Sequence, residues 1–314
     1  MATAAAEQAP APVQITVERL QHVYKGGTVA LDGVDLSFGT GLFGLLGPNG
    51  AGKSTLMKIM CTLLVPTGGT ATVGGHDVVD DRKAVRRLLG YLPQEFGAWR
   101  LHRVEEVLNT LALLSGLRDK ASRQNRVRDV LKQVGLHDVA DRKVKKLSGG
   151  MVRRLGVAQA LVHDPRVIVV DEPTVGLDPQ ERLKFRQLMA TLGQDRTIVL
   201  STHIVADLGS SCNDLALIDA GKIVFRGSPA ELVERANGQV FEITVNAGGE
   251  QRIAETFEVV SRTKSTEGST IRAVTADGNL PEGARRAQNP TIEEAYLAFM
   301  AARGRVDVAV AEES

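Results

Sequence analysis

A short glycine-rich segment contains the first residues whose types and spacing could do chemistry. It consists of Gly47, Pro48, Asn49, Gly50, Ala51, Gly52, Lys53, Ser54 and Thr55. An apolar run precedes it, helical spacing follows it, and its glycines allow successive backbone N–H groups to face an anion. The segment therefore predicts a nucleotide-binding loop, with Lys53 on the β- and γ-phosphates and the Ser54 hydroxyl on Mg²⁺. A chance glycine-rich turn is the alternative.

Two adjacent carboxylates follow the continuous apolar run Val167–Val170. Such a run indicates a strand buried on both faces, so Asp171 and Glu172 stand where this strand ends. Asp171 is placed to hold magnesium directly or through water. Glu172 is then free to act as the general base that polarises an attacking water. The alternative is a strand that ends in a solvated acidic turn.

A second possible anion-binding element lies upstream of that strand. Leu147–Met151 contains Ser148, Gly149 and Gly150, and the chain from 152 to 162 has helical character. A serine and two glycines at a helix start offer free N–H groups, a hydroxyl and the positive end of the helix dipole. One molecule does not need two cradles for a single γ-phosphate. We therefore expect this element to serve nucleotide held by a second subunit.

Together these motifs resemble those of the ATP-binding subunits of ABC transporters, in family order over residues 14–237. The segments that carry the resemblance are Gly47–Thr55 (Walker A), Gln94 (Q-loop), Leu147–Met151 (signature), Val167–Glu172 (Walker B), Gly176–Pro179 (D-loop) and His203 (switch histidine). Tyr24 stands where the family has an aromatic that stacks on adenine. Met151 departs from the commonest signature, which has Gln at that position, and this leaves the branch of the family and the turnover rate open.

The resemblance implies two copies that pair head to tail around two ATP molecules with Mg²⁺. It assigns nucleotide binding to Tyr24, Gly47–Thr55 and Gln94 of one copy and to Ser148, Gly149 and Gly150 of the other. It assigns catalysis to Lys53, Glu172 and His203, and magnesium binding to Ser54, Gln94 and Asp171. Taken alone, Gln94 and His203 could be ordinary polar residues, and Tyr24 a plain core or surface aromatic. A regulator without turnover is disfavoured, because Asp171, Glu172 and His203 are all present.

Strand-like and helical patterns alternate along most of the chain. They predict an α/β fold, a P-loop NTPase with a mostly parallel core sheet; the resemblance adds an antiparallel β subdomain and a helical subdomain. The strand-like runs are 14–20, 34–38, 42–46, 69–79, 167–170 and 197–201, and the helical ones 55–64, 104–114 and 126–134. We expect Pro66 to end the first of these helices.

The pattern changes after about residue 237. Short strand-like runs at 239–245, 257–261 and 270–274 precede a helix that Thr291 opens, with Glu294 completing a capping box. These features predict a small C-terminal α+β appendage. The expected organisation is a disordered lead (1–12), an ABC ATP-binding domain (13–237), the appendage (238–303) and an acidic tail (304–314).

Composition limits the classes of function. The 314 residues carry a formal net charge of +1, which gives no electrostatic footprint for non-specific nucleic-acid binding, so no nucleic-acid partner is expected. No run reaches the roughly 20 apolar residues that a membrane span needs. Cys61 and Cys212 have no metal-ligand spacing and are expected to be small core residues in a reducing compartment.

The hypothesis that follows is an export ATPase on the cytoplasmic face of the cell membrane, working with a separate transmembrane permease. The segment Asn289–Leu297 resembles the C-terminal part of ABC-2 type, drug-resistance exporter ATPases, which favours a small cargo such as a drug, an antibiotic or a lipid-like molecule. Phe96 and Trp99 are either anchors for the permease or a core pair. The competing hypothesis is a soluble ABC-type ATPase that acts on nucleic acid or ribosomes.

Overall fold

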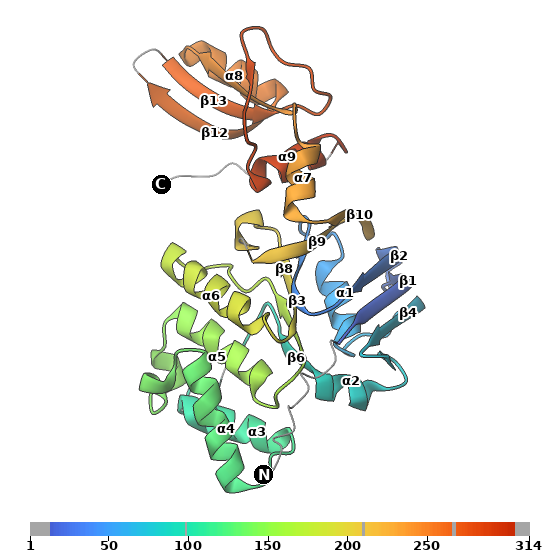
Figure 1. Ribbon diagram of the computed structural model, residues 1–314, viewed down its shortest axis with the longest axis vertical. Helices are drawn as coiled ribbons and strands as arrows, with labels where there is room; N and C mark the ends of the chain where they lie inside the picture. Colours follow the sequence, from blue (N-terminus) through green and yellow to red (C-terminus); the bar gives the residue numbers. More distant parts are fainter. Residues whose placement is uncertain (1–12, 98, 209–210, 266–267, 305–314) are drawn as a thin grey trace, which may run out of the picture. The chain divides into compact units, whose positions relative to one another are not determined.

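The structure, a computed structural model, describes residues 13–97, 99–208, 211–265 and 268–304 (Figure 1). Its contacts divide the chain into an N-terminal unit, Met1–Arg226, and a C-terminal unit, Gly227–Ser314. The predicted lead lies outside the described residues, as does the predicted acidic tail except for Gly304. In the part of the chain that the structure describes, no helix is both long and apolar enough to cross a bilayer.

A six-stranded sheet with the order β10-β9-β3-β8-β7-β6 forms the centre of the N-terminal unit, as far as that unit is described. Its strands are β3 (Gly41–Leu46), β6 (Leu89–Leu92), β7 (Val167–Asp171), β8 (Thr197–Thr202), β9 (Cys212–Asp219) and β10 (Lys222–Gly227). β3 runs parallel to β8 and β9, and β7 runs parallel to β6 and β8. All residues of β7 and β8 are buried, as expected for strands covered on both faces. The predicted parallel α/β core is confirmed.

A second, antiparallel sheet has the order β2-β1-β4-β5. Its strands are β1 (Ile15–Val23), β2 (Val29–Phe38), β4 (Gly68–Val73) and β5 (His76–Asp77). Buried apolar residues such as Ile15, Val17 and Leu36 recur at every second position over parts of β1 and β2. Helix α1 (Lys53–Met60) contacts this sheet through β2 and β4 and the central sheet through β7, so one apolar core joins both sheets.

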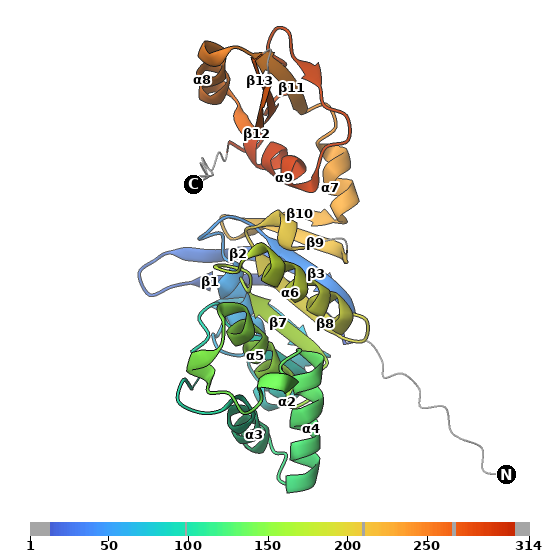
Figure 2. The ribbon, with the colours of Figure 1, turned by 90° about the vertical axis from the view of Figure 1, so that its left-hand side faces the viewer.

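Of the remaining helices in the described part of the N-terminal unit, those at the predicted runs 104–114, 126–134 and 152–162 are present, the second of them beginning earlier, at Lys120, whereas the helix at 179–192 was not predicted. The remaining helices are α2 (Arg82–Leu88), α3 (Val104–Leu114), α4 (Lys120–Gln133), α5 (Gly149–Leu161) and α6 (Pro179–Leu192), with 3-10 turns η1 (His137–Val139), η2 (Val144–Lys146) and η3 (Val205–Asp207). Helices α3, α4 and α5 pack on one another (Figure 2). Helix α5 also packs on β6. This group is the helical subdomain that the family resemblance implies.

The bounds predicted for the first helix, 55–64, are wrong at both ends. The helix begins at Lys53, because Gly52 adopts a φ of 112° and serves as its N-cap. It ends at Met60, since Thr62 has a φ of 61° and has left the helical region. Pro66 therefore lies beyond the end of the helix and does not terminate it.

The C-terminal unit combines an antiparallel sheet with three helices in its described residues. Its elements are α7 (Pro229–Arg235), β11 (Val240–Val245), α8 (Ala247–Thr256), β12 (Glu258–Ser265), β13 (Gly268–Val274), β14 (Arg285–Arg286) and α9 (Ile292–Ala301), and the sheet order is β12-β13-β11-β14. Phe241, Ile271 and Ile253 meet in its small apolar core. The contacts group α7 with this unit, whereas the sequence assigns it to the ATP-binding domain; the domain boundaries stay predictions.

An arginine on β13 ties α9 to the sheet. Arg272 donates from Nε to Glu294 Oε1 (2.6 Å) and from Nη2 to Glu294 Oε2 (3.0 Å), and it also pairs with Glu242 on β11. Glu294 completes the predicted capping box with Thr291. Burial opposes the ionisation of Glu294, but Arg272 and the Thr291 backbone outweigh it and lower the pKa of this carboxyl.

Replacing Glu294 by Gln is expected to reduce the local stability of the C-terminal unit by about 2 kcal/mol, the scale of a hydrogen bond to a charged group. Hydrogen exchange of the β13 amides measures this loss. Because the folded-state pKa is lowered, the contribution is complete above the unfolded-state pKa and is lost as the pH falls through the folded value. The difference between wild type and variant should therefore shrink under acid conditions. Glu293→Gln, an exposed change on the same helix, is the matched control and should leave the exchange unchanged.

Candidate nucleotide-binding site

Four parallel strands end at one edge of the central sheet and bring the predicted site together. The register pairs Leu46 of β3 with Thr202 of β8, Asp171 of β7 with Ser201 of β8, and Leu92 of β6 with Val170 of β7. The residues that follow these strand ends are the phosphate loop, Glu172, His203 and Gln94. Ligands of open parallel sheets bind outside the carboxyl ends of the strands, and this site conforms to that rule.

At two positions of the loop the backbone of a neighbouring strand comes so close that only glycine fits. A Cβ at Gly47 would stand 2.2 Å from the carbonyl oxygen of Ile218 on β9. A Cβ at Gly52 would stand 2.5 Å from the carbonyl oxygen of Ala30 on β2, and the φ of 112° at Gly52 is one that residues with side chains rarely adopt. The loop therefore takes this shape only with glycine at both positions.

Lys53 is buried at the start of α1, with its ammonium under the loop. Its Nζ donates to the carbonyl oxygens of Gly47 (2.7 Å) and Pro48 (3.0 Å) and lies 3.3 Å from Glu172 Oε1. Burial lowers the pKa of Lys53, while the charges of Glu172 and Asp171 oppose that shift. The ammonium is thus held beside the carboxylate assigned as the base.

Glu172 has its backbone and its carboxylate fixed by separate partners. Its φ is 44°, an uncommon value for a residue other than glycine. Its N–H donates to the carbonyl oxygen (3.1 Å) and the hydroxyl (3.2 Å) of Ser201. The Ser201 hydroxyl in turn donates to Asp171 Oδ1. At the other end, Glu172 Oε2 accepts from Gln94 Nε2 (3.4 Å) and lies 3.3 Å from His203 Nδ1.

A cavity of about 650 Å³ opens at this sheet edge. The predicted residues that line it are Tyr24, Asn49, Gly50, Gly52, Lys53, Ser54, Thr55, Gln94, Glu172 and His203. The Tyr24 hydroxyl hydrogen-bonds the Thr55 hydroxyl (3.0 Å), the residue is 41% exposed, and its ring packs nearly perpendicular to that of His22. An aromatic ring that is tethered but partly open can stack on a base.

Sequence reasoning missed several residues of this site. Thr28, Val29, Ala30 and Val175 also line the cavity, and Ser201 holds both carboxylate residues. The turn after Tyr24 could have indicated that the start of β2 faces the same space. Ser201 ends a buried run that pairs with β7, and its position directly opposite Asp171 follows only from the strand register.

Ser148, Gly149 and Gly150 do not line this cavity. Ser148 is the N-cap of α5, where its hydroxyl accepts from the Met151 N–H (3.2 Å), and both Ser148 and Gly149 are exposed. Gly150 is buried, and a Cβ there would stand 2.1 Å from Glu181 Oε2. The structure thus brings together one part of the predicted site and leaves the serine–glycine tip of α5 outside it.

The donor set fits a nucleotide with magnesium. Mg²⁺ prefers oxygen ligands and is usually held by one or two carboxylates together with substrate phosphates. Ser54, Gln94 and Asp171 offer a hydroxyl, an amide oxygen and a carboxylate. Within the described residues, no group of three or more His, Cys, Asp or Glu is placed to hold a metal ion.

Comparison with known proteins gives the family. The family model described as ABC transporter matches residues 31–175. The uncharacterized ABC transporter ATP-binding protein YxlF of Bacillus subtilis is 37% identical over 201 residues, 64% of this chain and 66% of YxlF. The probable multidrug ABC transporter ATP-binding protein YbhF of Escherichia coli is 31% identical over 273 residues, 83% of this chain and 47% of YbhF. The chain thus spans less than two thirds of the length of either relative.

A third relative is covered more completely. The daunorubicin resistance ATP-binding protein DrrA3 of Streptomyces coeruleorubidus is 34% identical over 247 residues, 76% of each chain.

Solved structures agree with the sequence relatives. CbiO1 from Clostridium perfringens, described as part of the ABC transporter complex cbiONQ, has 26% identity and a TM-score of 0.63 over 71% of this chain and 94% of its own. A dimeric ATP-binding cassette in a post-hydrolysis state with ADP and Pi has 26% identity and a TM-score of 0.62 over 68% of this chain and 98% of its own. The chain belongs to the ATP-binding proteins of ABC transporters, a family of ATPases.

Proposed function

We propose that the chain is the ATP-hydrolysing subunit of an ABC exporter and that it drives a separate transmembrane permease. The observation that carries this proposal is the position of Glu172. Its carboxylate lies in the cavity of the phosphate loop, 3.3 Å from Lys53 Nζ and 3.3 Å from His203 Nδ1. A buried base between two potential phosphate-binding groups is suited to hydrolysis as well as binding.

In the proposed reaction, a water oxygen bonds to the γ-phosphorus as the bond from that phosphorus to the ADP oxygen breaks. Glu172 accepts the proton that the water loses. Lys53 binds the phosphate oxygens, and His203 lies beside the base, where it can orient the γ-phosphate. Mg²⁺ held by Ser54, Gln94 and Asp171 would neutralise phosphate charge.

We further propose that a second copy completes each site with Ser148, Gly149 and Gly150. The exposed helix tip outside the chain's own cavity supports this arrangement, because the N–H groups at a helix start suit a phosphate brought by a partner. The dimeric cassette described above supports it as well. ATP would close the pair and hydrolysis would reopen it.

The direction of transport and the cargo class rest on the relatives. DrrA3 is named for daunorubicin resistance and YbhF as a multidrug transporter protein, which supports a drug or an antibiotic as the exported cargo. CbiO1 belongs to a complex with other chains, which supports a separate permease. The proposed location is the cytoplasmic face of the membrane, bound to that permease.

The segment after Gln94 offers a surface for the permease. Phe96 is half-buried, and its ring borders the position where a Cβ on Gly156 of α5 would stand, so it contributes to packing. Trp99 is 43% exposed and Leu101 70% exposed. Exposed apolar side chains that follow Gln94 closely in the chain are suited to anchoring a partner helix.

Replacing Glu172 by Gln is expected to lower ATP hydrolysis by about 10²–10⁴-fold, because the variant has no group to accept the proton. Nucleotide binding should persist, and the closed dimer should accumulate with ATP. Phosphate release and size-exclusion chromatography measure the two effects. Glu18→Gln, an exposed change on β1, is the control and should behave as wild type. Hydrolysis at the wild-type rate in the Glu172 variant would refute the assignment of the base.

Co-purification tests the transporter proposal. A multi-span membrane protein should remain with the chain in mild detergent, and the double change Trp99→Ala with Leu101→Ala should weaken that retention while basal ATPase activity is kept. Leu183→Ala, which removes an exposed apolar side chain on α6, is the matched control. If no membrane protein is retained and DNA or RNA stimulates the ATPase instead, the nucleic-acid hypothesis replaces the exporter.

A further inference from the structure

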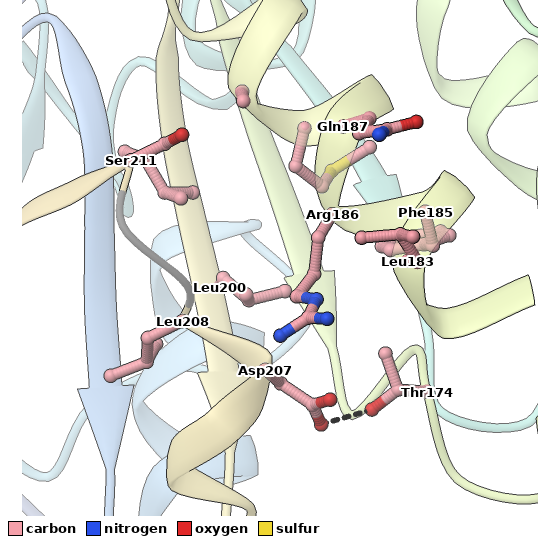
Figure 3. Close-up of a pocket in the computed structure, with 12 residues that line it drawn as sticks. Thr174, Leu183, Phe185, Arg186, Gln187, Leu200, Asp207, Leu208 and Ser211 are labelled. Atoms are coloured by element: carbon pink, nitrogen blue, oxygen red, sulfur yellow. Dashed lines mark hydrogen bonds between the residues drawn. The ribbon is translucent and has the colours of Figure 1, made fainter. Parts of the chain in front are cut away.

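A buried carboxylate lies behind the site, in the 3-10 turn that follows β8. Asp207 is 3% exposed, and its Oδ2 accepts from the Thr174 hydroxyl. The Thr202 hydroxyl lies 3.2 Å from the same oxygen and 3.2 Å from the Ile204 carbonyl oxygen, so these two acceptors share its single proton. Figure 3 shows the bond to Thr174, which connects η3 to the loop after β7. Both threonines are themselves buried. Burying a carboxylate is unfavourable unless it is hydrogen-bonded, and here two donors from different segments meet it.

Each partner of Asp207 adjoins a residue of the proposed reaction. Thr174 is two positions after Glu172, and Thr202 directly precedes His203. Glu172 and His203 are themselves 3.3 Å apart. The chain segment after β7, which carries Glu172, and the end of β8, which leads into His203, are therefore connected twice. They meet directly through the Glu172–His203 contact, and they meet again through the Asp207 carboxylate.

Further hydrogen bonds stiffen both arms of the connection through Asp207, the Thr202 arm and the Thr174 arm. The Thr202 hydroxyl accepts from the Ile204 N–H (2.8 Å), and the Asp207 N–H donates to the Ile204 carbonyl oxygen (3.0 Å). On the other arm, the Leu177 N–H donates to the Thr174 carbonyl oxygen (3.1 Å), which shapes the turn before α6. A shift of Asp207 would thus be transmitted to both arms at once.

We propose that Asp207 is a positioning residue for ATP hydrolysis: through Thr174 and Thr202 it sets the placement of Glu172 relative to His203. This inference rests on the proposed function of the site. Asp207 does not line the nucleotide cavity, so it acts through its two partners and not on the substrate. A displacement of about 1 Å at a reacting group can lower a rate by about 10²-fold, so a small loss of this connection is sufficient for a measurable effect.

The first test compares Asp207→Ala with Asp207→Asn. The alanine variant should lower kcat by about 10- to 100-fold while the KM for ATP changes by less than about threefold, because the cradle for the phosphates is untouched. The asparagine variant keeps an acceptor oxygen and should retain kcat within about threefold of wild type. Thermal unfolding of each variant shows how much folded protein is assayed. Equal loss of kcat in the two folded variants would overturn the proposal.

The second test removes the arms one at a time. Thr174→Val and Thr202→Val should each lower kcat, and adding Asp207→Ala to either should lower it by less than in wild type, since the same connection is already broken. Thr197→Val is the matched control: it removes a buried β8 hydroxyl that bonds the Val13 carbonyl (3.0 Å), and it should affect stability but not kcat. If the fold-loss of kcat in each double variant equals the product of the losses in its two single variants, the proposal is overturned.

The two levels of inference fail in different ways. Wild-type protein that does not hydrolyse ATP would refute the proposed function itself. Wild-type protein that hydrolyses ATP, with Asp207→Ala melting at a lower temperature but turning over at the wild-type kcat, would leave that function standing and reduce Asp207 to a structural residue.

Discussion

The ammonium of Lys53 and the carboxylate of Glu172 are both buried at the carboxyl edge of the central sheet. The groups around them stabilise these two opposite charges. Charges removed from water are unfavourable unless their hydrogen bonds are satisfied. The ammonium is met by two loop carbonyls and by the carboxylate, and the carboxylate is met by Lys53 and Gln94, with His203 nearby. The parallel strands hold these partners at fixed spacing, because each contributes its end to the same edge.

The same constraint determines the backbone around the pair. Gly47 and Gly52 allow the loop to pass against the carbonyls of Ile218 and Ala30, which places the Lys53 amine beneath the curl. Glu172 is held at a positive φ by the backbone and hydroxyl of Ser201. Both groups are thus fixed by neighbours on other strands.

Sequence patterns predict those features that are local in the chain. The parallel core followed from uninterrupted apolar runs such as Val167–Val170, and the phosphate loop from its glycine spacing. Helix α8 was missed because Gly248 and Gly249 lie in its first turn and resemble a loop, whereas the Asn246 side chain caps it there. Asp207 and Ser201 were missed because their roles depend on strand register and on threonines far apart in the sequence, for which a single sequence carries no signal.

The exposed Ser148–Gly149 tip has a consequence for the genetics of this protein. If its phosphate belongs to the partner, every chain carries halves of two different sites. A chain with a damaged loop and a chain with a damaged tip would then restore one intact site when they pair, whereas each alone would have none. By the same reasoning, a sound chain paired with a chain damaged in only one of these elements would keep one intact site and lose the other.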